Sequence, residues 1–180
     1  MRYAQIRSLD ISNGEGIGVS LFVQGCNFHC YNCFNSETWD FSGGKEWTPQ
    51  VRDHFLALID KPYIKRVSIL GGEPLAKENV HEVLDIVKRI RQFYSNDKKI
   101  WLYSGYTWET IMNHNQSYVG KIEEIYSIRK NIISLCDIMI DGRFIDSQKN
   151  STLKWRGSRN QRVIDIQNSI KKSTVVLYEK

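Results

Sequence analysis

Three of the chain's four cysteines lie close together, at Cys26, Cys30 and Cys33, with the spacing Cys-x3-Cys-x2-Cys. Three such thiolates can hold three irons of a cubane [4Fe-4S] cluster and leave the fourth iron without a protein ligand. Electron-transfer clusters take four cysteines, and structural zinc sites are also closed by four ligands. A three-cysteine cluster keeps an open iron at which a substrate or cofactor can bind. The spacing therefore predicts a catalytic metal centre.

A zinc knuckle is the alternative use of the same cysteines, with His29 or Cys136 as the fourth ligand. His29 is adjacent to Cys30 in the chain, which leaves little freedom for relaxed metal geometry. Cys136 lies in an apolar stretch, where a cysteine usually serves as a small buried hydrophobe. The open iron–sulfur cluster is therefore the preferred interpretation.

A second candidate site is the run Gly71-Gly72-Glu73-Pro74, which follows an apolar stretch expected to be a strand. Two residues without Cβ allow the backbone to come close to a ligand. Glu73 adds a negative charge, and Pro74 stiffens the exit from the turn. This combination suits a cationic ammonium group.

These loops must be positioned by strands and helices that alternate along the chain. Thr48 and Pro49 are typical of a helix start, as N-cap and first helical residue, and an apolar stripe recurs at helical spacing over 80–94. Strands are expected at 3–11, 17–24, 67–70, 99–103, 136–140, 162–166 and 174–178, and helices at 49–60, 80–94, 107–113 and 119–134. The pattern predicts an α/β fold with a mostly parallel sheet and right-handed crossover helices. The cysteine loop, 71–74, 104–106 and 141–144 each follow a strand, so they should converge at one sheet edge.

Length and composition set the wider limits. The 180 residues fit a single domain spanning 1–180. The chain is 41% hydrophobic and 25% charged, which is typical of a globular protein. It shows no apolar run long enough to cross a membrane and no apolar secretion signal at its start, so we expect a cytoplasmic protein. Acidic residues are interspersed with the basic ones, which favours a mixed solvated surface over nucleic-acid binding despite the net charge of +5.

With these motifs the chain resembles the radical S-adenosylmethionine (radical SAM) enzymes, and among them the activating proteins of anaerobic (class III) ribonucleotide reductases. The resemblance covers nearly the whole chain, in the family's order, through 11–16, 21–26, 33–35, 71–74, 101–106, 141–144 and 155–162. It implies one radical SAM activase domain built as an open partial (β/α) barrel.

The resemblance also implies the chemistry. Cys26, Cys30 and Cys33 would ligate the [4Fe-4S] cluster, and its open iron would bind the methionine part of S-adenosyl-L-methionine. One electron from a donor such as flavodoxin would cleave the sulfonium to methionine and a 5′-deoxyadenosyl radical. That radical would take a hydrogen atom from a glycine of the reductase large subunit. No side chain is required as a general acid or base, because the cofactor carries the chemistry.

The contacts to S-adenosylmethionine are implied in the same way. Gly71, Gly72 and Glu73 would meet the methionine ammonium. The backbone at Asn32, Cys33 and Phe34 would lie along the adenosyl part. Asn32 departs from the aromatic or aliphatic residue that radical SAM enzymes often have before the third cysteine.

Several alternatives stay open at this point. A radical SAM enzyme that modifies a small molecule, or a non-catalytic metal-binding adaptor, would use the same cysteines. The aromatic stretch 101–108 is either an adenine-stacking surface or core packing. The basic residues between 149 and 162 either dock the partner protein or form a solvated surface.

Overall fold

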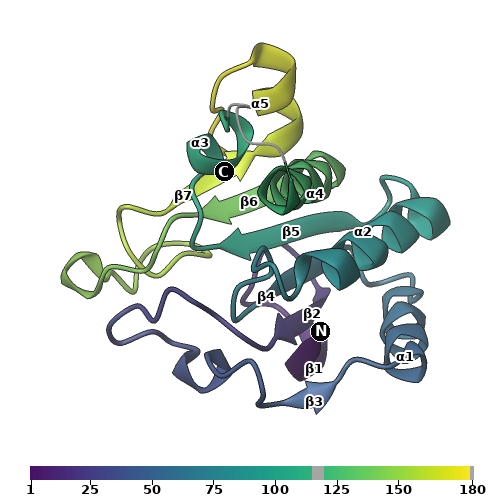
Figure 1. The fold of residues 1–180 in the computed structure, drawn as a ribbon. Coiled ribbons are helices and arrows are strands. Elements are labelled where there is room, and N and C mark those ends of the chain that lie inside the picture. The colour runs from purple at the N-terminus through teal and green to yellow at the C-terminus, as the bar shows by residue number, and fades with distance from the viewer. Residues whose placement is uncertain (115–119, 179–180) are drawn as a thin grey trace.

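A computed structural model describes residues 1–114 and 120–178. Within these ranges seven strands form one sheet, in the order β3-β1-β2-β4-β5-β6-β7 (Figure 1). The strands are β1 (Arg2–Asp10), β2 (Gly18–Val23), β3 (Lys45–Glu46), β4 (Arg66–Gly71), β5 (Lys99–Ser104), β6 (Ile138–Asp141) and β7 (Arg162–Asp165). The α-helices are α1 (Pro49–Ile59), α2 (Val80–Tyr94), α3 (Trp108–Met112), α4 (Lys121–Leu135) and α5 (Ile166–Lys172).

The sheet is mixed, which corrects the expectation of a mostly parallel one. Strands β2, β4, β5 and β6 run parallel to one another. β1 and β3 at one edge and β7 at the other are antiparallel. The connection 11–17 between β1 and β2 is too short for a crossover helix, so these two strands must form an antiparallel pair.

The helices that link the parallel strands lie on one face of the sheet. These strands follow one another in chain order, and right-handed crossovers then bring α1, α2 and α4 to the same side. Figure 1 shows the three helices on that side. The main core lies between them and the sheet and includes Leu21, Ile69 and Leu102, each fully buried.

Local sequence signals explain the two helices that were expected most clearly. Thr48 caps α1, with its side chain accepting a hydrogen bond from the Val51 N–H at 3.3 Å. Pro49 is the first helical residue, where its missing N–H costs nothing. Helix α2 buries the expected stripe, including Val83 and Val87. The first residue of the helix expected at 119–134 lies outside the described residues.

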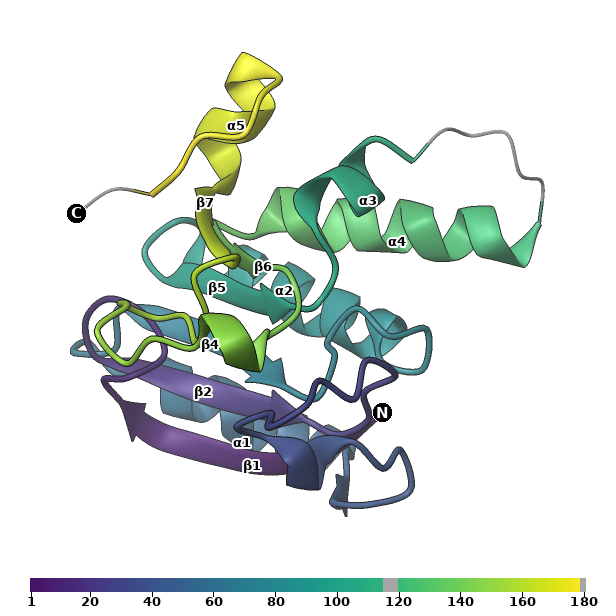
Figure 2. The ribbon, with the colours of Figure 1, turned by 90° about the vertical axis from the view of Figure 1, so that its left-hand side faces the viewer.

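The opposite face of the sheet is covered by irregular segments. These are the connection 11–17 and a long excursion between β6 and β7, residues 142–161, which we call the strap (Figure 2). Trp101 of β5 packs on this face against Trp155 of the strap, with ring centroids 4.9 Å apart. Trp101 and Trp108 are both buried, which confirms core packing for these two aromatic residues.

The structure corrects three further expectations. Strand β6 begins at Ile138, and Cys136 instead ends helix α4, although it is fully buried as expected. The segment 174–178 joins the sheet through a single bridge, Ile164 to Leu177. Helix α5 and the two-residue strand β3 were not expected. In the described part of the chain, no helix has the length and apolar character needed to cross a membrane.

Candidate active site

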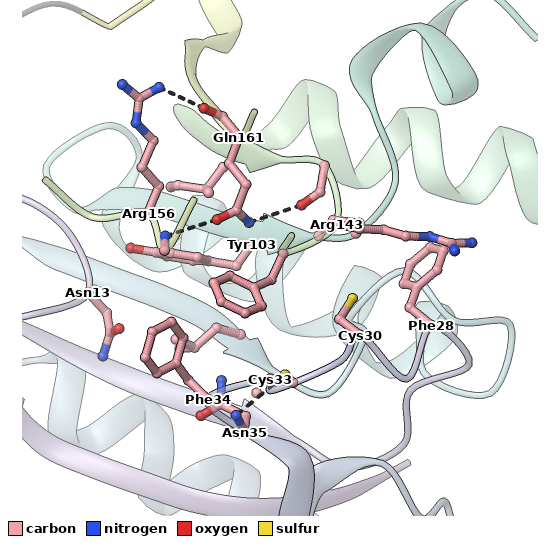
Figure 3. Close-up of a pocket in the computed structure, with 18 of the residues that line it drawn as sticks. Asn13, Phe28, Cys30, Cys33, Phe34, Asn35, Tyr103, Arg143, Arg156 and Gln161 are labelled. Carbon is pink, nitrogen blue, oxygen red and sulfur yellow. Dashed lines mark hydrogen bonds between the residues drawn. The ribbon is translucent and has the colours of Figure 1, made fainter. Parts of the chain in front are cut away.

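A cavity of about 480 Å³ lies where β2, β4, β5 and β6 end. The four loops that were expected to converge at this edge all contribute to its lining. Figure 3 shows Cys30 and Cys33 on one side of this space, Arg156 and Gln161 of the strap on the other, and Arg143 beside Phe28 near Cys30. The expected site residues that line the cavity are Cys26, Cys30, Cys33, Phe34, Gly71, Gly72 and Glu73. Asn32 is exposed and is not among the lining residues, so its role stays a prediction.

The cysteine loop begins at a glycine that no other residue could replace easily. Gly25 has φ +97°, and a Cβ there would lie 2.0 Å from the Phe41 ring. Its N–H donates to the Thr38 carbonyl at 2.8 Å. Farther along, His29 and Asn32 both have positive φ, at 46° and 54°. These two reversals fold the loop back on itself.

The three thiols lie close enough to influence one another. Burial raises the pKa of Cys26, and the negative charges of Glu73 and Cys30 raise it further. The pKa of Cys30 is raised by burial and by the charge of Cys33. Backbone N–H groups oppose this at Cys26. Separately, the Asn35 N–H donates to the Cys33 sulfur at 3.4 Å. Three thiolates in this arrangement need bound cationic metal to be stable together.

The donor set fits a cluster better than a single ion. No group of three His, Cys, Asp or Glu side chains in residues 1–114 and 120–178 could hold one metal ion. Cys136 is buried in the helix-covered core and His29 packs beside the Trp39 ring, so neither supports the zinc knuckle. A cubane cluster requires a different arrangement, because each cysteine binds a different iron and the cysteine sulfurs lie farther apart than around a single ion. The amides directed at sulfur are also the contacts that tune such clusters.

The turn at 71–73 packs directly on the strand that leads into the cysteine loop. Gly71 has φ +102°. A Cβ on Gly72 would lie 2.4 Å from the Gly25 carbonyl oxygen. The Gly72 N–H donates to the Val23 carbonyl and the Glu73 N–H to the Gly25 carbonyl, both at 2.8 Å. The missing Cβ at Gly72 thus makes room for backbone, in addition to any room it leaves for a ligand.

Glu73 lines the cavity and connects its own turn to the loop 104–106. Its carboxylate accepts hydrogen bonds from the Leu75 N–H, the Ser104 hydroxyl and the Gly105 N–H, each at 2.8 Å. Burial raises the pKa of Glu73 to about 7, against the opposing effect of these bonds. The Asn79 amide donates to the carbonyls of Gln24 and Glu73, both at 3.0 Å. The turn and the cysteine strand are therefore held in fixed relation.

A buried arginine on the sheet face opposite the crossover helices positions one lining residue that the sequence analysis did not single out. Arg66 is fully buried and donates to the carbonyls of Asp10 and Asn13, both at 2.6 Å. The Asn13 amide in turn donates to the Asp10 carboxylate at 2.6 Å. Figure 3 shows Asn13 at the side of the cavity. Asn13 lies in the motif 11–16, one of the stretches that carry the family resemblance, and this motif could have identified it as a site residue.

The strap supplies the remaining lining residues. Arg156 donates to the Gln161 carbonyl at 2.6 Å, and the Gln161 side chain donates to the Gly142 carbonyl at 3.0 Å. Phe144 meets Phe34 of the cysteine loop edge to face, with centroids 5.1 Å apart. The strap therefore covers one side of the cavity and packs on the cysteine loop.

Comparisons with known proteins agree with this geometry. A family model described as a 4Fe-4S single cluster domain matches residues 12–164. The chain is 34% identical over 163 residues to proteins of Vibrio cholerae and Escherichia coli (strain K12), covering 89% of this chain and 96% of each relative. It is 32% identical over 165 residues to a protein of Enterobacteria phage T4, covering 91% of this chain and 93% of the relative. All three relatives are named anaerobic ribonucleoside-triphosphate reductase-activating protein.

Proposed function

The chain belongs to the family of anaerobic ribonucleoside-triphosphate reductase-activating proteins, and on that premise we propose that it generates a glycyl radical on such a reductase. The observation that carries the proposal is that Cys26, Cys30 and Cys33 share one cavity with the turn 71–73. When bound, the [4Fe-4S] cluster would supply the one electron needed to cleave S-adenosylmethionine, and this chemistry would serve to remove a hydrogen atom from a glycine of the reductase.

The chain's own residues bind and orient the cofactors and shield them within the cavity. Cys26, Cys30 and Cys33 hold three irons. The turn 71–73 meets the methionine ammonium, and the buried Glu73 favours this cation through its charge while fixing the turn to Gly105. The backbone of 32–34 lies along the adenosyl part. The half-buried state of the cysteines and the cavity that Cys26, Cys30, Cys33, Phe34 and the turn 71–73 share support these roles, apart from that of Asn32.

The fold and the cellular setting complete the proposal. The chain acts as a single radical SAM activase domain, and the parallel strands with their one-sided helices form an open partial (β/α) barrel. Its partners are the large subunit of the reductase and a small one-electron donor such as flavodoxin, in the cytoplasm, with no role for nucleic acid or membrane. The one-sided placement of α1, α2 and α4 supports the partial barrel.

The test begins with anaerobically purified protein. It should contain about four irons per chain and release 5′-deoxyadenosine when reduced in the presence of S-adenosylmethionine. Mixed with its anaerobic reductase, it should produce a carbon-centred glycyl signal in electron paramagnetic resonance. The signal should require both S-adenosylmethionine and a reductant. A protein that holds zinc and releases no 5′-deoxyadenosine would contradict the proposal.

A further inference from the structure

Most of the chain's net charge is concentrated in the strap. Among residues 142–161 there are five basic residues and one acid, Asp146, so this segment carries four of the five net positive charges. The basic residues are Arg143, Lys149, Lys154, Arg156 and Arg159. The rest of the chain is nearly neutral. Because the strap borders the cavity, the positive field of the protein is centred on its candidate active site.

The strap presents these charges on an ordered element. Its middle forms a hairpin, with Lys149 bridged to Ser158 in antiparallel fashion. The Asn150 N–H donates to the Gly157 carbonyl at 3.1 Å, and the Arg159 N–H donates to the Gln148 carbonyl at 3.0 Å. Figure 2 shows the strap in front of the sheet, on the face without the crossover helices. A fixed geometry lowers the entropy cost of binding a partner.

The strap's charges are not neutralised within the protein. None of its five basic side chains forms an ion pair with an acid in the described part of the chain. Among the lining residues that the structure describes, Glu73 is the one acid, and it is buried. Arg143 lies over the Phe28 ring at 4.4 Å and Lys149 over the Phe34 ring at 5.0 Å.

Exposed aromatic side chains accompany these cations. Phe34 is 60% exposed and Tyr31 is 76% exposed, both in the cysteine loop. Aromatic residues and arginine are enriched at the centres of protein–protein interfaces. The cysteine loop and the strap meet where Phe34 packs on Phe144. Together they form a continuous surface of aromatic and basic groups beside the cavity.

We propose that the strap docks an acidic surface of the reductase and so brings the target glycine to the cavity. This inference rests on the proposed function for the identity of the partner. Charge complementarity selects an acidic protein surface. A nucleic acid is disfavoured because the strap's own rings, Phe144 and Trp155, are half-buried and already pack against other rings, whereas base stacking needs exposed aromatic faces.

The test reverses charges that do not line the cavity. Lys154 and Arg159 are exposed and are absent from its lining. We expect Lys154→Glu with Arg159→Glu to raise the dissociation constant for the anaerobic reductase by about tenfold or more at low salt, since like charges then face each other. Lys154→Gln with Arg159→Gln should give an intermediate loss. The control, Lys88→Glu with Lys121→Glu, makes the same change in net charge on exposed residues of α2 and α4.

Binding is measured by titration calorimetry, and 5′-deoxyadenosine release is measured without reductase. The proposal predicts weaker binding for the strap variants alone, unchanged release without reductase, and a difference that shrinks as salt is raised. Unchanged binding by the strap variants, or an equal loss in the control, would overturn it. So would displacement of the reductase by a mixed-sequence oligonucleotide. If the wild type releases no 5′-deoxyadenosine while the strap variants still bind the reductase more weakly, the radical chemistry fails and the docking surface stands.

Discussion

Replacing Gly72 by alanine tests the packing of the turn 71–73 on the cysteine loop. The added Cβ would lie 2.4 Å from the Gly25 carbonyl oxygen, 2.9 Å from the carbonyl carbon and 3.0 Å from the nitrogen. All three atoms belong to backbone, so no side-chain rotation can relieve the contact. The turn must move away from Gly25, and the Glu73 N–H then loses its 2.8 Å hydrogen bond to that carbonyl.

The expected cost is the sum of two effects. Overpacking a well-packed site costs about 1 to 3 kcal/mol. Losing a hydrogen bond adds about 1 kcal/mol. We therefore expect Gly72→Ala to lower the free energy of unfolding by about 3 kcal/mol. Because Gly25 directly precedes Cys26, the shift should also displace the cysteine loop, and on the proposed function it should weaken both cluster binding and S-adenosylmethionine binding.

Urea unfolding of the metal-free protein, followed by circular dichroism, gives the magnitude. Gly16→Ala is the matched control, because Gly16 has φ +76° but no atom within 4 Å of its added Cβ. It should show only the conformational cost of about 1 kcal/mol. A smaller loss for Gly72→Ala than for Gly16→Ala would refute the packing argument.

Three further predictions concern the residues around the site. Hydrogen bonds from Asn13 and Ser12 outweigh the opposing effect of burial and lower the Asp10 pKa to about 2, so Asp10→Asn should cost about 2 kcal/mol at neutral pH. Because the folded-state pKa of Asp10 is depressed, this contribution is complete above about pH 4 and is lost as pH falls through about 2. Urea titrations across that range should show the free energy of unfolding of the wild type falling toward that of Asp10→Asn. Asn79→Ala removes two hydrogen bonds of 3.0 Å and should lower the free energy of unfolding by about 2 to 3 kcal/mol in the same assay. An unchanged urea midpoint would show that Asn79 does not stabilise the turn. Cys30→Ala should lose bound iron and 5′-deoxyadenosine release, whereas Cys136→Ala should keep both and lose about 1 kcal/mol of stability; loss of release from folded Cys136→Ala would contradict the ligand assignment.

The regular elements were predictable where apolar periodicity and capping chemistry agreed. Thr48 and Pro49 fixed the start of α1, and the apolar stripe of α2 is buried as expected. Helix α5 was missed although a cap signal was available, since Asp165 accepts from the Asn168 N–H at 3.0 Å. Strand β3 is two polar, exposed residues and carries no pattern to detect.

The site was predictable from short motifs and less so from the segments that complete it. The cysteines and the turn 71–73 carry distinctive spacing, and the cavity brings them together. Arg66 could not be foreseen as a buried residue, because the carbonyls that accept its hydrogen bonds are far away in the sequence, at Asp10 at the end of β1 and at Asn13 in the connection that follows. The strap has no apolar period, and its shape depends on contacts such as that between Phe144 and Phe34.

The two ends of the strap are clamped together, because Asp141 pairs with Arg162 in the antiparallel β6–β7 ladder. A segment with fixed ends can be lengthened or exchanged at a small cost, since loop-closure entropy grows only with the logarithm of length. The main core lies on the other face of the sheet and would not be disturbed. Grafting a strap from another member of the family should therefore leave the main core intact, provided that the contacts of Phe144 with Phe34 and of Trp155 with Trp101 are kept. If the strap docks the reductase, partner preference should follow the graft.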